Sequence, residues 1–125
     1  MHVGYTAAFQ NPFDALSDFE VYREELRLCD LAVELGFESL WTVEHVIVPS
    51  NYQSAYPYDP SGKMPGGEEM PIPDPLIWLA YLAAATSRIN LATGVVILPQ
   101  RNPVVLAKEL ATLDHLSGGR VTLGV

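Results

Sequence analysis

The clearest indication of the fold is the segment Thr93-Gly94-Val95-Val96-Ile97-Leu98-Pro99-Gln100-Arg101-Asn102-Pro103, which runs into Ala107-Lys108-Glu109. It predicts an apolar strand that ends at a glycine, a turn with one cation, and a helix that begins at Asn102-Pro103. Asparagine is a good N-cap, and proline suits the first helical position because the N–H group it lacks would have no partner there. In β/α enzymes such strand-to-helix loops carry the chemistry, at the carboxyl ends of the strands.

Outward from this stretch, strands and helices alternate along the chain. The predicted strands are residues 3–9, 39–44, 89–95 and 121 onward. The first predicted helix begins at the capping box of Ser17 and Glu20 and ends at Gly36. The second covers residues 76–86, after the cap Asp74-Pro75, and the third covers residues 103–116, before Gly118-Gly119. This order calls for parallel strands with right-handed crossovers. A doubly wound sheet and half of a (β/α)8 barrel both have it, and the spacing does not choose between them.

The composition excludes several classes of partner. Seven Lys and Arg residues against fifteen Asp and Glu give a net charge of −8, so nucleic acid and anionic membranes are poor partners. The longest apolar run, residues 76–85, is shorter than the roughly 20 residues of a membrane span.

The single cysteine, Cys29, fits a reducing compartment, and we expect a cytoplasmic protein. Because the chain stops inside an apolar strand, we also expect it to be the first half of a longer protein.

Residues 46–73 form a segment of a different kind. They contain six prolines, three glycines and three tyrosines, a density of breakers that no helix or long strand survives. Structureless loops of this length in compact domains tend to be lids or binding loops. The tyrosines Tyr52, Tyr56 and Tyr58 fit either an apolar cluster under the loop or the lining of a substrate pocket. We interpret Lys63, the loop's one cation, as a solvated charge.

Position along the strands sorts the three histidines. His2 precedes the first strand and His115 lies in the last turn of the third helix, so both fit structural roles at the opposite end. His45 directly follows the second strand, beside Glu44, and opens onto the loop 46–73, which favours a functional role. Glu44 either ionises at the pocket or is a buried carboxylate held by backbone donors. Because adjacent strand residues point to opposite faces, the two side chains need not both enter the cavity.

A metal site is disfavoured, because no second histidine reaches the end of the strands that carries His45 and no paired-cysteine spacing is present. Thr93-Gly94 allows two interpretations: the glycine serves tight strand packing, or it lets the backbone approach a flat ligand closely. Arg101 is either a solvated charge or a functional cation of the next loop.

Seven segments, taken together and in order, match a known pattern. They are Leu40-Trp41-Thr42-Val43-Glu44-His45, Asp74-Pro75-Leu76, Ala84-Ala85-Thr86-Ser87-Arg88-Ile89, Ala92-Thr93-Gly94-Val95, Leu98-Pro99-Gln100-Arg101-Asn102-Pro103, Ala107-Lys108-Glu109 and Leu113-Asp114-His115-Leu116-Ser117-Gly118-Gly119-Arg120. As a set they resemble the luciferase-like monooxygenase superfamily, and most closely its deazaflavin (coenzyme F420)-dependent oxidoreductase branch. The resemblance covers nearly the whole chain.

The resemblance implies a fold and a site. Residues 1–125 are expected to be the N-terminal half of a (β/α)8 TIM barrel, with four parallel strands and three helices, and residues 46–73 its lid. A flavin or deazaflavin would lie across the mouth with the third strand behind its central ring, near Thr93, Gly94, Val95 and Arg101. In relatives a bulge, often with a non-prolyl cis peptide, lies where Thr93-Gly94 falls.

The function implied is transfer of a hydride between reduced coenzyme F420 and a small-molecule substrate, in a protein expected to be a homodimer. His45, with Glu44 beside it, would donate a proton or stabilise charge. Two alternatives stay open: an FMN-dependent monooxygenase that uses molecular oxygen, and a non-catalytic flavin-binding or structural relative.

Overall fold

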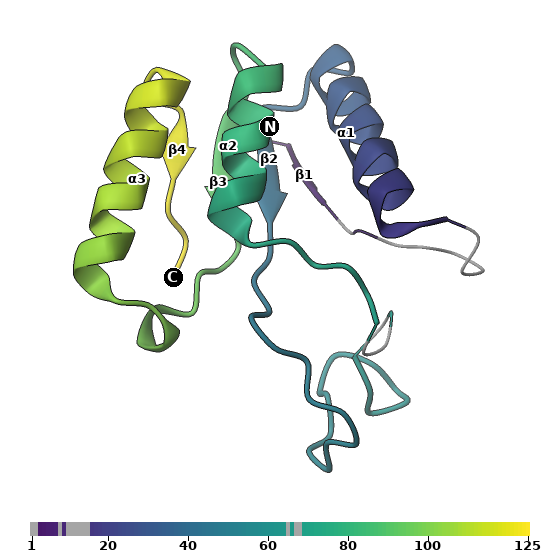
Figure 1. Ribbon diagram of the computed structural model, residues 1–125. Helices are drawn as coiled ribbons and strands as arrows, with labels where there is room; N and C mark the ends of the chain where they lie inside the picture. The colour runs from purple at the N-terminus through teal and green to yellow at the C-terminus, as the bar shows by residue number, and fades with distance from the viewer. Residues whose placement is uncertain (1–2, 8, 10–15, 65, 67–68) are drawn as a thin grey trace.

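Four parallel strands form one sheet in the computed structural model, which describes residues 3–7, 9, 16–64, 66 and 69–125. The strands are β1 (Gly4–Thr6), β2 (Ser39–Thr42), β3 (Asn90–Thr93) and β4 (Val121–Thr122), and each pairs in parallel with the next along the chain. The helices are α1 (Asp18–Glu34), α2 (Pro75–Ala85) and α3 (Pro103–Ser117). The predicted alternation of strands and helices is confirmed (Figure 1).

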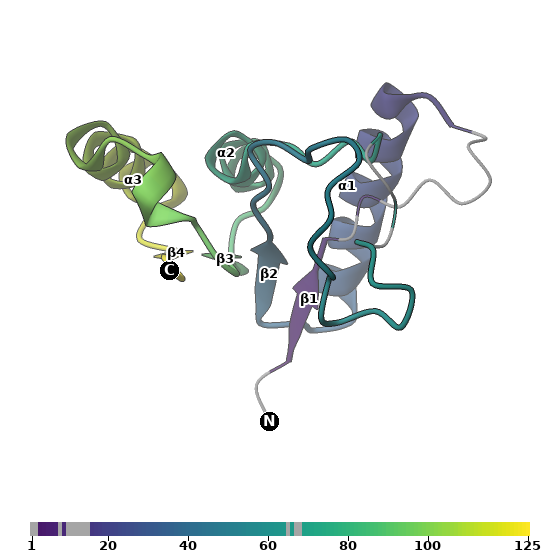
Figure 2. The ribbon, with the colours of Figure 1, turned by 90° about the horizontal axis from the view of Figure 1, so that it is seen from below.

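The strand order decides between the two architectures that the sequence leaves open. The sheet runs β1-β2-β3-β4 without a reversal. A doubly wound sheet reverses its order and carries helices on both faces, whereas Figure 2 shows all three helices on one side of this sheet. The chain therefore has the arrangement of half of a (β/α)8 barrel, with helices outside and the other face of the sheet turned inward.

The helices begin and end where local signals predict. The capping box of Ser17 and Glu20 precedes α1. Asp74 accepts hydrogen bonds from the first free N–H groups of α2 at 2.9 and 3.0 Å, and Asn102 does the same for α3 at 3.0 and 3.2 Å. Gly118, with a φ of 74°, ends α3 in the left-handed conformation that glycine adopts at little cost. Each of these signals acts within one helical turn.

The strands are shorter than the sequence predicts. β2 ends at Thr42 rather than at residue 44, β3 ends at Thr93 rather than at 95, and β1 covers three of the seven residues expected. The last backbone contact between β2 and β3 is the hydrogen bond from Gly94 N–H to Thr42 O, at 2.7 Å. Beyond it the two segments leave the sheet, so Glu44 and Val95 lie in the loops that follow the strands.

The buried face of α1 includes a charged group. Its buried residues are Val21, Glu25, Cys29 and Ala32. The carboxylate of Glu25 accepts hydrogen bonds from the Tyr5 hydroxyl at 2.6 Å and from Phe9 N–H at 3.1 Å. Burial, and then the contact with Glu25, raises the pKa of Tyr5. Glu25 thus links α1 to β1.

Candidate functional site

The carboxyl ends of β2 and β3 lie side by side. Thr42 stands opposite Thr93 in the parallel register, and Gly94 is bonded to Thr42. His45 comes three residues after Thr42, and Gly94-Val95 directly follow Thr93. The structure therefore brings the residues predicted from both strands to one edge of the sheet, the edge from which the loop 46–73 extends (Figure 1).

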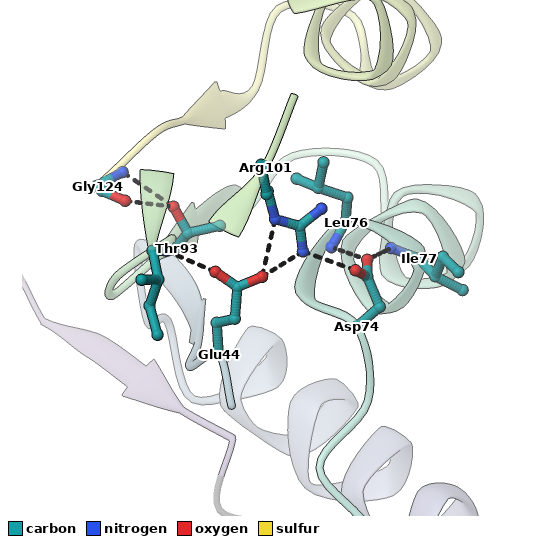
Figure 3. Close-up of polar contacts among 8 residues, drawn as sticks. Glu44, Asp74, Leu76, Ile77, Thr93, Arg101 and Gly124 are labelled. Carbon is teal, nitrogen blue, oxygen red and sulfur yellow. Dashed lines mark hydrogen bonds and ion pairs between the residues drawn. The ribbon is translucent and has the colours of Figure 1, made fainter. Parts of the chain in front are cut away.

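Glu44 lies inside this edge, and both of its carboxylate oxygens are occupied. Its side chain is 1% exposed. Oε2 accepts the N–H of Ile97 at 2.5 Å, and Oε1 accepts Nε of Arg101 at 2.8 Å as well as Nη2 of the same guanidinium (Figure 3). Of the two interpretations of Glu44, the buried carboxylate is the one that this geometry favours, with a guanidinium added to the backbone donor. Its assignment as a catalytic residue stays a prediction.

Arg101 connects Glu44 to the start of α2. Its side chain is 15% exposed, and Nη2 also donates to Oδ2 of Asp74 at 2.6 Å, while the other oxygen of Asp74 caps the helix (Figure 3). Partial burial acts to raise the pKa of Asp74, but hydrogen bonds from Arg101 and from the backbone of α2 outweigh it and leave the pKa below its usual value. Burial acts to lower the pKa of Arg101, and the two carboxylates more than offset this, so that pKa is raised.

The four residues predicted to bind a cofactor fall into two groups. The side chains of Thr93 and Arg101 are engaged within the protein: the buried Thr93 hydroxyl accepts Gly124 N–H at 2.9 Å and donates to Gly124 O at 3.0 Å. Gly94 and Val95 are open to the outside, and the peptide bond between them is cis. A Cβ atom at Gly94 would lie 3.1 Å from Cε3 of Trp41, so the absence of a side chain there allows close packing against the indole. Direct contact of these residues with a cofactor stays a prediction.

His45 is exposed, and exposed apolar side chains follow it in the sequence and follow the neighbouring strand. Val46 and Ile47 follow it, Val95 and Leu98 follow β3, and all four are exposed. Exposed apolar groups at the end of a barrel's strands suit a flat, aromatic ligand, because such a ligand buries them without leaving polar groups unpaired. These residues therefore fit a flavin-type ring. Within the described part of the chain, no three His, Cys, Asp or Glu side chains come together as a metal site.

The loop 46–73 is folded on itself. Lys63 is exposed, but its Nζ donates to Tyr52 O at 2.9 Å and lies 4.1 Å from the centre of the Tyr52 ring, so it is not a freely solvated charge. Tyr56 and Tyr58 pack edge to face with ring centres 5.6 Å apart. The tyrosines thus make contacts within the loop, and Tyr58 is largely exposed, so a place for them in the lining of a substrate pocket stays a prediction.

The remaining histidines lie away from this edge or outside the description. His115 is exposed in the last turn of α3, as predicted, and His2 lies outside the described residues. Sequence reasoning missed two features: the second role of Asp74 as a partner of Arg101, and the burial of Glu25. The cap signal at Asp74 was visible, but nothing in the sequence indicated where its second oxygen points.

Comparison with known proteins identifies the family. The profile of the luciferase-like monooxygenase family matches residues 1–125. The chain belongs to the luciferase-like monooxygenase family. This confirms the resemblance of the sequence motifs, and the half-barrel arrangement is the one expected of the family.

Individual members of the luciferase-like family give the degree of similarity. An uncharacterized protein of Mycobacterium tuberculosis is 42% identical over 95 residues, covering 76% of this chain and 34% of the relative. The 4-hydroxyprotoasukamycin monooxygenase of Streptomyces nodosus subsp. asukaensis is 33% identical over 121 residues, 94% of this chain and 27% of that enzyme. The crystal structure of the monooxygenase RslO1 from Streptomyces bottropensis superimposes with a TM-score of 0.72 at 36% identity, covering 99% of this chain and 32% of that one. The chain thus spans about a third or less of the length of these relatives.

Within the part of the chain that the structure describes, none of the helices has the length and apolar character needed to cross a membrane.

Proposed function

We propose that the whole protein is an oxidoreductase that acts on a small organic substrate with a flavin-type cofactor bound over the carboxyl ends of the strands. The observation that carries this proposal is the exposed His45 at the same edge as the open Gly94-Val95 backbone. In TIM barrels this edge is where active sites lie. The first form of the proposal uses coenzyme F420, on the basis of the motif resemblance.

The cofactor would supply hydride transfer, or the activation of oxygen in the FMN form, and the protein would supply orientation and electrostatics. Gly94 and Val95 would lie behind its ring, and Thr93 and Arg101 would hold that backbone in place from within. Residues 1–125 would form the N-terminal half of the barrel domain, and the loop 46–73 its lid, which excludes water when closed.

His45 would exchange a proton with the substrate through an imidazole nitrogen, or stabilise charge that develops there. Histidine suits this work because its ordinary pKa lies near neutral pH, and a well-placed general acid or base contributes about 10²–10⁴-fold to the rate. Glu44, whose oxygens are all bonded, would orient the segment that carries His45.

The second candidate is an FMN-dependent monooxygenase, and the relatives support it. The 4-hydroxyprotoasukamycin monooxygenase is 33% identical, and a flavin-dependent trigonelline monooxygenase of Acinetobacter baylyi is 30% identical over 112 residues. An F420-dependent secondary alcohol dehydrogenase superimposes with a TM-score of 0.66 but at 20% identity, which is a likeness of fold alone.

Titration of the whole protein with FMN and, separately, with coenzyme F420 tests the two forms, followed by fluorescence. Binding of F420 with substrate reduction in the absence of oxygen supports the first form. Binding of FMN with substrate-dependent oxygen consumption supports the second. Binding of neither cofactor would contradict the proposal and favour a non-catalytic relative.

The proposal includes a homodimer in the cytoplasm. Helix α2 carries no charged residue, yet Ile77 is 72% and Tyr81 54% exposed. A helix that is apolar on all sides is normally buried, and a second copy of the same protein would cover this face. The free, buried Cys29 fits a reducing compartment. Light scattering of the whole protein at twice the mass of one chain would support the dimer, and a single-chain mass would contradict it.

A further inference from the structure

One side chain contacts both ends of the loop 46–73. Glu44 lies two residues before the loop and Asp74 directly follows it. The guanidinium of Arg101 donates to both: to Oε1 of Glu44 through Nε and Nη2, and to Oδ2 of Asp74 through Nη2, at 2.6 Å (Figure 3). The two stems of the loop are therefore held by a single cation.

The body of the loop is held together by its own bonds. The Tyr52 hydroxyl accepts Met64 N–H at 2.7 Å, and Lys63 Nζ donates to Tyr52 O at 2.9 Å. The Asp59 carboxylate accepts the N–H and the hydroxyl of Ser61 at 2.8 and 2.6 Å. A segment with this many internal contacts tends to move as a unit, so its position depends on its stems.

The carboxylate of Glu44 also fixes the segment that follows the neighbouring strand, β3. Oε2 of Glu44 accepts the N–H of Ile97 at 2.5 Å, and Ile97 lies two residues after Val95. The segment behind the predicted cofactor ring and the upstream stem of the loop thus share one anchor.

We propose that Arg101 is a positioning residue that fixes the position of the loop 46–73 relative to His45 and Gly94-Val95. This inference rests on the proposed function, in which that loop is the lid. A planar guanidinium presents its N–H groups in a rigid fork and binds two carboxylates at once, whereas a lysine ammonium on a flexible stem is a point charge. An Arg101→Lys variant therefore keeps the charge and loses the double attachment.

The test uses tryptic cleavage after Lys63, the one Lys or Arg of residues 46–73, in the whole protein without cofactor or substrate. Asp74→Asn keeps an amide oxygen to cap α2 and replaces the carboxylate that pairs with Arg101, so it releases only the downstream stem. We expect cleavage after Lys63 to be about fivefold faster or more in this variant, and faster still in Arg101→Lys, because a loop with a released stem leaves its held position more often. Arg27→Lys, in the exposed pair with Glu24, is the matched control and should cleave at the parental rate.

Kinetics separate positioning from mere stability. Asp74→Asn should raise the KM for substrate more than it lowers kcat, and Arg101→Lys should change both, at temperatures where unfolding curves show the variants folded. Unchanged cleavage after Lys63 in both variants, together with a lower unfolding midpoint, would overturn the proposal and leave a purely structural ion pair. The cleavage assay needs no cofactor, so faster cleavage in a protein that binds neither FMN nor F420 would refute the proposed function while supporting the role of Arg101.

Discussion

Two arginines hold opposite ends of the molecule in different ways. Arg101, at the carboxyl ends of the strands, pairs with the carboxylates of Glu44 and Asp74. Arg120, at the amino ends, donates mainly to backbone carbonyls: Ser117 O at 2.6 Å, Ile89 O at 2.9 Å, and, at the end of α2, Ala83 O at 3.0 Å and the C-cap Thr86 O at 3.1 Å.

The partners explain the difference. Carbonyls at helix C-termini lack partners within the helix and carry partial negative charge, so the guanidinium of Arg120 supplies the hydrogen-bond donors that they need. Arg101 lies in the segment after β3 and bonds to two other segments outside the sheet, the one that follows β2 and the one that begins α2. In a TIM barrel, residues at the amino ends of the strands serve stability and residues at the carboxyl ends serve catalysis.

Replacing His45 should affect activity most. We expect His45→Ala to lower kcat of the whole protein by about 10²–10⁴-fold, the usual contribution of a general acid or base. Because the side chain is exposed and follows the strand, the free energy of unfolding should change by less than about 0.5 kcal/mol.

The matched control is His115→Ala, which removes an exposed histidine at the amino end of the fold. Its kcat should stay within a factor of two or so of the parent. Equal activity in the two variants would remove His45 from the mechanism.

Replacing Arg120 should affect stability instead. Arg120→Ala removes the donor to the carbonyls of Ala83, Ile89 and Ser117, and we expect a loss of about 3 kcal/mol in the free energy of unfolding, measured with denaturant. Cofactor affinity and kcat should be unchanged where the variant is folded. A specific loss of activity in the folded variant would show that the amino end takes part in function.

Two glycines extend the comparison. Gly94→Ala brings a Cβ to 3.1 Å from the Trp41 ring at the open edge, so we expect the cofactor Kd to rise about tenfold, or about 1.4 kcal/mol. Gly118→Ala places alanine at a φ of 74° at the end of α3 and should cost about 1 kcal/mol of stability without changing the Kd. The reverse assignment of the two effects would contradict the division of the molecule.

The smallest effect is a pH dependence at Asp74. Its pKa is below the usual value in the folded protein, so the ionised form contributes stability that is present above the unfolded-state pKa and lost as pH falls through the folded one. At pH 7 Asp74→Asn should be less stable than the parent by under about 1 kcal/mol, since such partly exposed pairs are weak. Denaturant curves should show this difference shrink as the pH falls below about 4 and vanish below the folded-state pKa of Asp74. A difference that persists into acid would assign the effect to the helix cap.

The sequence predicts what is decided locally. The caps Asp74 and Asn102, the capping box at Ser17 and the stop at Gly118 depend on neighbours within one turn, and all four are observed. The strands alternate with the helices as expected, but spacing could not distinguish a barrel from a doubly wound sheet, because that choice lies in which strands pair.

Contacts between residues far apart in the sequence could not be predicted. Glu44 and Arg101 are separated by 57 residues, and the sequence offered each an equally good position in solvent. Glu25, a charged residue on the buried face of α1, breaks the apolar pattern because it accepts hydrogen bonds from the Tyr5 hydroxyl and from the N–H of Phe9, which follows β1. The position of His45 could be predicted, since it follows from the strand that precedes it.

Hydrogen exchange of the whole protein, with and without bound FMN or F420, shows whether the cofactor lies over the carboxyl ends of β2 and β3. We expect bound cofactor to slow exchange in residues 43–47 and 94–101, which follow β2 and β3, and to leave exchange in residues 86–90 and 117–121 unchanged. Protection confined to the amino-end segments, with none at His45 or Gly94-Val95, would contradict this position of the cofactor.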